Sequence, residues 1–162
     1  MASNFDFLAE EFPHIYQEIK QAEQNTFMAP RYAAMLCRSA LEMSLFWLYE
    51  NDADFEMPYD TSINSLLHTD SFRDNIRASV REELNAVRLL GNVASHAGKG
   101  NAVKNIKDTE ALHVLKCMYN FLHWIAKLYA KRFPSDLEFD EGLIPRGQIA
   151  DINAQKVKEL NN

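Results

Sequence analysis

The sequence predicts a single-domain, all-helical protein, built as a bundle of about four main helices with several short ones. Hydrophobic residues make up 47% of the chain and charged residues 25%, which is typical of a globular domain. Only five glycines and five prolines occur in 162 residues, which favours long, uninterrupted helices. No segment shows the alternating pattern of β-branched residues that predicts a strand.

The helices follow one another with few breaks. Helical periodicity and proline or glycine stops predict a short helix near 5–12, a helix beginning at Pro13, and further helices at 30–51, 61–67, 72–76, 77–97 and 109–133. Gly98 and Gly100 end the helix at 77–97, and Pro134 ends the last one. We therefore expect a bundle domain at 1–133. Residues 134–162 are predicted to be an extended connector and the start of a following segment, as in a chain cut from a longer protein.

The helix at 30–51 is apolar around most of its circumference, so it is predicted to be either the central helix or part of an oligomer interface such as a homodimer. Arg38 and Glu42 lie one turn apart on this otherwise apolar stretch. A buried ion pair needs close hydrogen bonding to offset its desolvation, and Glu42 reaching towards Arg88 is one way to provide it.

The helix at 77–97 carries a narrow polar wedge beside its apolar faces. Arg88, Asn92 and His96 are spaced four residues apart, so an ideal helix would let them converge. A cation, an amide and an imidazole together are suited to a phosphate or to a partner carboxylate. The alternative is structural: Arg88 pairs with a neighbouring carboxylate and His96 bonds a backbone carbonyl to orient the helices.

The last long helix has a polar stripe that includes a possible basic face of His113, Lys116, His123 and Lys127. Such a stripe could contact nucleic acid, but it is more often a solvated face, and the net charge of −6 argues against non-specific binding to a phosphate backbone. His113 and Cys117 have a spacing that zinc sites use. No third and fourth ligand is evident, so we expect no metal.

No motif in the sequence completes a catalytic set: there is no glycine-rich phosphate loop, no GxSxG and no HExxH.

The two cysteines, Cys37 and Cys117, lie in apolar helical patterns and form no CxxC pair, which favours a reduced protein. The first residues lack the order of a signal peptide, and no apolar run is long enough for a membrane span. We expect a cytoplasmic protein that does not contact a membrane.

Three segments, SNFDFLAEEFP, PRYAAMLCRSALE and VRLLGNVASHAG, resemble a helical domain at the amino end of type I restriction enzyme R subunits, which is usually placed near the HEPN superfamily. The resemblance covers roughly residues 3–133. It implies a HEPN-like bundle that acts as a non-catalytic accessory or assembly domain. The expected partners are the other restriction-modification subunits, with DNA contacted through the parent protein.

The same resemblance implies that the parent is an ATP-dependent deoxyribonuclease whose later domains bind ATP and Mg²⁺, while this chain needs no cofactor. Arg88, Asn92 and His96 match the HEPN-like pattern. Active HEPN ribonucleases typically have a polar residue after the arginine and a gap of four to six residues before the histidine. Here Leu89 follows Arg88, and seven residues separate Arg88 from His96. The alternative function is a HEPN-type ribonuclease or nucleotide-binding domain that uses Arg88 and His96.

Overall fold

The computed structural model describes residues 2–96, 105–147 and 160. Every regular element within these ranges is helical, which confirms the predicted all-α bundle of four long helices with short ones. The elements are η1 (Asp6–Leu8), α1 (Pro13–Asn25), α2 (Pro30–Asn51), α3 (Ile63–Leu67), α4 (Asp70–Asn75), α5 (Ala78–Ser95), α6 (Asp108–Tyr129) and η2 (Glu141–Leu143). None of the helices described is both long and apolar enough to cross a membrane.

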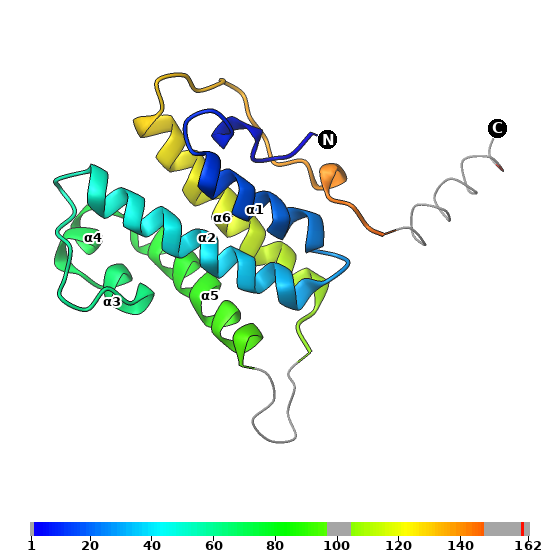
Figure 1. The fold of residues 1–162 in the computed structure, drawn as a ribbon, viewed down its shortest axis with the longest axis horizontal. Coiled ribbons are helices and arrows are strands. Elements are labelled where there is room, and N and C mark those ends of the chain that lie inside the picture. The colour runs from blue at the N-terminus through cyan, green and yellow to red at the C-terminus, as the bar shows by residue number, and fades with distance from the viewer. Residues whose placement is uncertain (1, 97–104, 148–159, 161–162) are drawn as a thin grey trace.

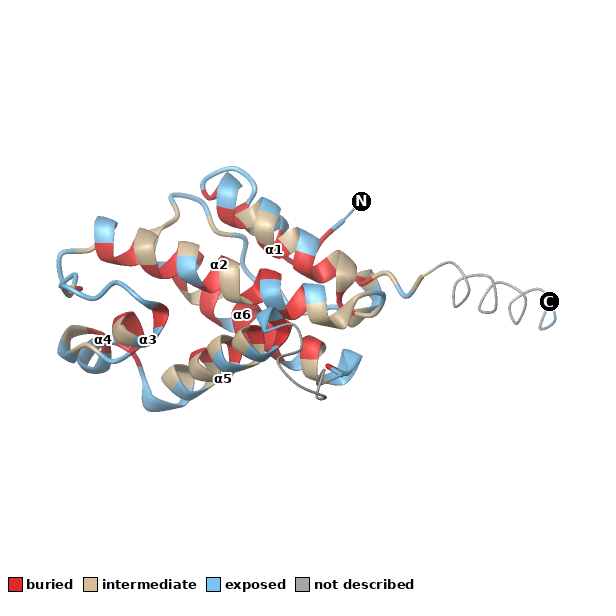
Figure 2. Cartoon of the chain, turned by 60° about the horizontal axis from the view of Figure 1, so that its bottom comes forward, coloured by how far each residue is buried: buried red, intermediate tan, exposed pale blue. Residues whose placement is uncertain are grey.

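The four long helices lie side by side, and α2 is the central one, in contact with α1, α5 and α6 (Figure 1). The first of the two predicted roles of this helix, a central position, is therefore confirmed, while Tyr32 and Met35 on the same helix are exposed. The short helices α3 and α4 lie across one end of α2 and α5 (Figure 1). Buried residues lie on the sides of the long helices that face one another, while the outer sides carry exposed residues (Figure 2).

Helix α6 ends at Tyr129, four residues earlier than the predicted end at 133. The backbone is already extended at Ala130. The carboxylate of Glu11, which precedes α1, accepts hydrogen bonds of 3.0 Å from the backbone N–H of Lys131. A carboxylate from the other end of the chain thus binds an N–H group that a longer helix would use, and Pro134 prevents any continuation.

The segment after α6 returns along the bundle and packs beside the amino-terminal segment (Figure 1). The buried side chain of Asn4 donates to the carbonyl of Asp140 at 2.9 Å and accepts from its N–H at 2.6 Å. The same amide donates to the buried carboxylate of Glu23 at 2.9 Å. Asn4 therefore joins η1, α1 and the segment before η2.

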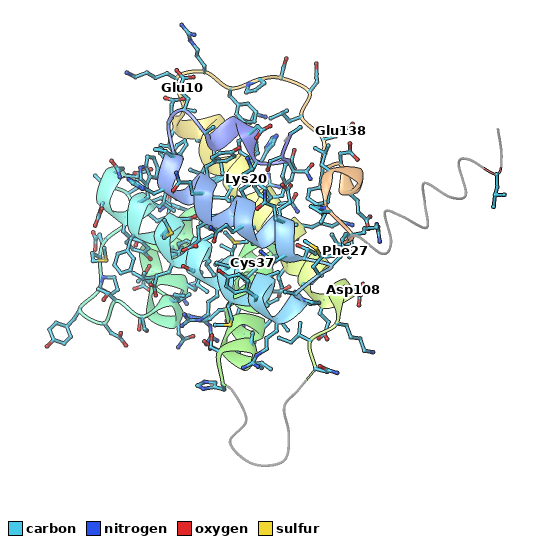
Figure 3. All side chains as sticks on the ribbon, turned by 45° about the vertical axis from the view of Figure 1, so that its right-hand side comes forward. Glu10, Lys20, Phe27, Cys37, Asp108 and Glu138 are labelled. Atoms are coloured by element: carbon cyan, nitrogen blue, oxygen red, sulfur yellow. The ribbon has the colours of Figure 1, made fainter. Side chains whose placement is uncertain are left out.

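A second contact fixes the connector further along. Ile144 is buried, and the Arg146 guanidinium lies 4.1 Å from the centre of the Phe27 ring. Figure 3 shows Phe27 at the end of the bundle where the connector passes. Residues 134–147 are mostly irregular, as an extended connector would be, but they are held against the bundle at several points. The predicted helix start at 151–162 and the glycine stop at Gly98 and Gly100 lie outside the described residues, apart from Leu160.

Candidate functional site

Helix α5 packs against both α2 and α6 and has two unlike flanks. Along the α2 flank are half-buried polar side chains, among them Asn85, Arg88 and Asn92. Along the α6 flank are Leu89 and Val93, both exposed. The buried positions of the helix, such as Leu84 and Val87, face the core between these flanks. The candidate site therefore consists of two adjacent surfaces on one helix.

The structure brings together Arg38 and Asn92, two residues of the predicted polar site whose contact with each other was not predicted. Nε of Arg38 donates to Oδ1 of Asn92 at 2.7 Å across the α2–α5 contact. Gly91 makes this contact close, because a Cβ placed there would lie 2.3 Å from Cβ of Arg38. The hydrocarbon part of Arg38 therefore lies directly against the α5 backbone, which fixes where its guanidinium emerges.

Arg88 belongs to the same flank but binds a neighbour on its own helix. Its Nε and Nη2 donate to Oδ1 of Asn85 at 3.1 and 2.8 Å. The ion pair with Glu42 that the sequence suggested is not formed, and Glu42 does not pair with Arg38 either. Glu42 is exposed and lines a hollow between α1 and α2, beside His14 and Phe46. Helical spacing alone does not show which way a long side chain turns from its face, which is why this pairing was wrong.

His96 does not continue the helical face of Arg88 and Asn92. Helix α5 ends at Ser95, and His96 has φ −83° and ψ 86°, outside the helical range. Its backbone N–H still bonds the carbonyl of Asn92 at 3.2 Å, but its side chain is exposed. Arg88, Asn92 and His96 were predicted to lie on one helical face at successive turns. Arg88 and Asn92 do, but His96 does not, because the helix ends before it.

The contact between α2 and α5 that carries Arg38 and Asn92 is called the polar seam here. Two residues that contribute to it were not recognised as contributors from the sequence. Arg31, at the start of α2, donates from Nε to the carbonyl of Ala94 at 2.7 Å. Gly91 allows the close approach of the helices. A glycine in the interior of a helix costs about 1 kcal/mol relative to alanine, so its presence was a signal of close packing. Nothing in the sequence indicated the partner of Arg31.

The other flank of α5 forms an open groove with α6, with a volume of about 500 Å³. Its lining is mainly apolar, with polar groups on the α6 side: Ala86, Leu89, Leu90, Val93, Thr109, Glu110, His113 and Val114. Leu89 is 48% exposed and Val93 39% exposed. Leu89 and Val93 are thus neighbouring exposed aliphatic side chains along one groove.

The four residues of the predicted basic face on α6 do not share one environment, because one of them is packed among aromatic side chains and the other three are exposed. His113, Lys116 and Lys127 are exposed, and Nζ of Lys116 lies 5.7 Å from the centre of the Phe139 ring. His123 is half-buried and packs edge-on against Phe133, with ring centres 4.8 Å apart. Burial, with a smaller effect from the Lys127 cation, lowers the pKa of His123. His123 therefore belongs to an aromatic cluster rather than to a basic binding surface.

The cysteines have the properties of core residues. Both are buried and free, and Sγ of Cys117 lies 3.8 Å from Nε2 of His113. Burial raises the pKa of the Cys37 thiol well above its usual range and that of Cys117 to about 12, with the Glu83 carboxylate adding to the second. Thiols with such raised pKa values are poor nucleophiles and poor metal ligands. No cluster of three or more metal-ligating side chains occurs in the part of the chain that the structure describes.

These features define an all-helical bundle with one helix that carries a polar seam on one side and an apolar groove on the other. A family model described as Domain of unknown function (DUF4145) matches residues 20–145, and the chain belongs to this family. The match includes α2, α5 and α6, and so both flanks of the candidate site. No curated protein and no solved structure matches the chain. The family description names neither restriction enzymes nor the HEPN superfamily, so those resemblances stay predictions.

Proposed function

We propose that this domain is a non-catalytic accessory domain of a type I restriction enzyme R subunit, and that it assembles with other restriction-modification subunits through the groove between α5 and α6. The observation that carries the proposal is the exposure of Leu89 and Val93 along this groove. Covering such side chains contributes roughly 25 cal/mol for each Å² of apolar surface removed from water.

The composition of the groove supports a protein partner. Aliphatic side chains from α5 occupy one side, while Thr109, Glu110 and His113 supply polar groups along α6. Protein interfaces commonly combine an apolar centre with a polar rim. The lining belongs to two long helices of the bundle, so the surface is formed before a partner arrives and little ordering is needed on binding.

The alternative, a HEPN-type ribonuclease or nucleotide-binding domain, requires Arg88 and His96 to act on one substrate. Arg88 is turned towards Asn85, and His96 lies beyond the end of α5 with an exposed side chain. Among the described residues, no hydrogen bond orients the His96 imidazole. A general base normally lies within hydrogen-bonding reach of the proton that it removes, held by a second group. This geometry favours assembly over cleavage.

The proposal is tested by measuring binding of the domain to the other subunits of the restriction-modification complex, with the double variant Leu89→Glu, Val93→Glu. We expect the wild type to bind and the variant to bind at least about tenfold more weakly, because a carboxylate buried without a partner is costly. Both side chains are exposed, so the variant should unfold at nearly the wild-type temperature.

The control is Met57→Glu, which adds one negative charge, against two in the double variant, at an exposed methionine in the loop after α2. This control should bind like the wild type. The proposal is contradicted if the wild type binds none of the subunits, or if the double variant and Met57→Glu bind equally well.

A further inference from the structure

A second hollow lies beside α6, where the chain passes from α4 into α5, and has a volume of about 360 Å³. Its lining comes from the α4–α5 junction, the first turn of α5 and the carboxyl-terminal half of α6: Asn75, Ile76, Arg77, Val80, Asn120 and Trp124. None of these residues lines the groove at Leu89 and Val93. Sites for small molecules typically measure about 300–1,000 Å³, so this hollow is large enough for a small ligand.

Part of the hollow is an apolar wall that includes an aromatic ring. Trp124 is half-buried and stacks with Phe121, with an angle of 10° between the ring planes. The ring of Tyr129 meets the indole edge-on at 82°. These contacts hold the indole in place, and Ile76 and Val80 add aliphatic side chains to the lining. A fixed indole beside aliphatic groups suits a flat aromatic ring, because aromatic rings attract one another in offset-stacked and edge-on arrangements.

The polar groups of the hollow are mainly unused donors. Of the described residues that line it, Arg77 alone is charged, and its exposed side chain forms no ion pair with another described residue. The side-chain amide of Asn120 and the indole N–H of Trp124 also have no hydrogen-bond partner within the described ranges. Asn75, in contrast, donates to two backbone carbonyls, which fixes its amide. A guanidinium with free N–H groups is suited to a carboxylate, which it binds through two parallel hydrogen bonds.

We propose that this hollow binds a small aromatic carboxylate, with its ring against the Trp124 indole and its carboxylate at Arg77. Asn120 lies one helical turn before Trp124, so its amide can donate to the same carboxylate. A neutral ring would leave the guanidinium without a partner, and a carboxylate without a ring would leave the apolar wall in water. The site does not depend on the assembly function, and loss of subunit binding in the Leu89 and Val93 variant would leave it intact.

The test is an NMR titration of the ¹⁵N-labelled protein with sodium benzoate at constant ionic strength, with sodium acetate and benzamide as separate arms. We expect saturable shifts of the Trp124 indole N–H and the Asn120 side-chain amide with benzoate. Acetate has the charge without the ring, and benzamide has the ring without the charge, so each should bind at least about tenfold more weakly. The indole N–H of Trp47, which lines the hollow between α1 and α2, should shift much less.

Arg77→Gln should weaken benzoate binding about tenfold or more, as expected for the loss of charge-assisted hydrogen bonds. Arg77 is exposed, so this variant should give the amide spectrum of a folded protein. Arg77→Lys keeps the charge but not the fork, and should bind benzoate with an affinity between those of the wild type and Arg77→Gln.

Arg73→Gln is the matched control, because it removes an exposed arginine of α4 that pairs with Asp70 and does not line the hollow. It should leave benzoate binding unchanged. Absence of saturable shifts with benzoate, binding of acetate or benzamide as tight as that of benzoate, or an equal loss in Arg73→Gln and Arg77→Gln would overturn the proposal.

Discussion

Replacing Gly91 by alanine is expected to lower the free energy of unfolding by about 1–3 kcal/mol, although alanine is the better helix former by about 1 kcal/mol. The added Cβ would lie 2.3 Å from Cβ and 2.7 Å from Cδ of Arg38. Cβ of Arg38 is attached directly to the α2 backbone, so a change of rotamer cannot relieve the overlap. Helices α2 and α5 must move apart, which loosens the packing of buried residues such as Leu84 and Val87.

Urea unfolding of Gly91→Ala in two backgrounds measures this effect and its cause. The loss in free energy of unfolding caused by Gly91→Ala should be much smaller in an Arg38→Gly background than in the wild-type background. With glycine at position 38, α2 has no Cβ there for the new alanine to clash with. Glu82→Ala, at an exposed position of the same helix, controls for helix propensity and should change stability little. A Gly91→Ala variant as stable as the wild type, or an equal cost in both backgrounds, would show that the helices do not approach as described.

Replacing Asn4 by alanine is expected to lower the free energy of unfolding by about 2–4 kcal/mol. The change removes both hydrogen bonds with the Asp140 backbone and the amide donor to the Glu23 carboxylate. Asn4 is 7% exposed and Glu23 2% exposed, so water cannot readily replace the lost partners. The N–H of Asn4 still donates to Glu23, which limits the loss.

Thermal or urea unfolding provides the measurement, and hydrogen exchange at the Asp140 amide reports the local contact. The exchange should become faster in Asn4→Ala, because its acceptor is gone. Asn120→Ala is the control, at an exposed position of α6, and should change stability by less than about 1 kcal/mol. If the two variants are equally stable, Asn4 does not hold the connector to the bundle.

The helices were predictable because their signals are local. The bounds of α2 agree with the predicted 30–51, since Pro30 stands in its first turn and the apolar periodicity ends before Asp52. The end of α6 was not predictable in this way. It depends on Glu11 binding the backbone N–H of Lys131, a contact between residues 120 positions apart, which no local pattern shows.

The candidate site was predictable as a set of faces but not as a set of contacts. The helical spacing correctly placed Arg88 and Asn92 on one side of α5, and the Arg38–Asn92 contact joins two residues singled out from the sequence. The spacing failed for His96, because the helix stops one residue before it. It also failed for Glu42, which turns towards α1 rather than towards Arg88. The direction of a long side chain and the position of a helix end depend on tertiary packing, which the helical spacing in a sequence does not show. The predictions for Glu42 and His96 failed for this reason.

A binding role is distinguished from a catalytic one most directly by an RNA-cleavage assay on the purified protein and on its His96→Ala variant. The exposed position of His96 beyond the end of α5 predicts that single-stranded RNA stays intact with both proteins, and that both unfold at nearly the same temperature. Cleavage by the wild type that is lost in a folded His96→Ala variant would contradict a non-catalytic assembly domain and establish the HEPN-type ribonuclease instead.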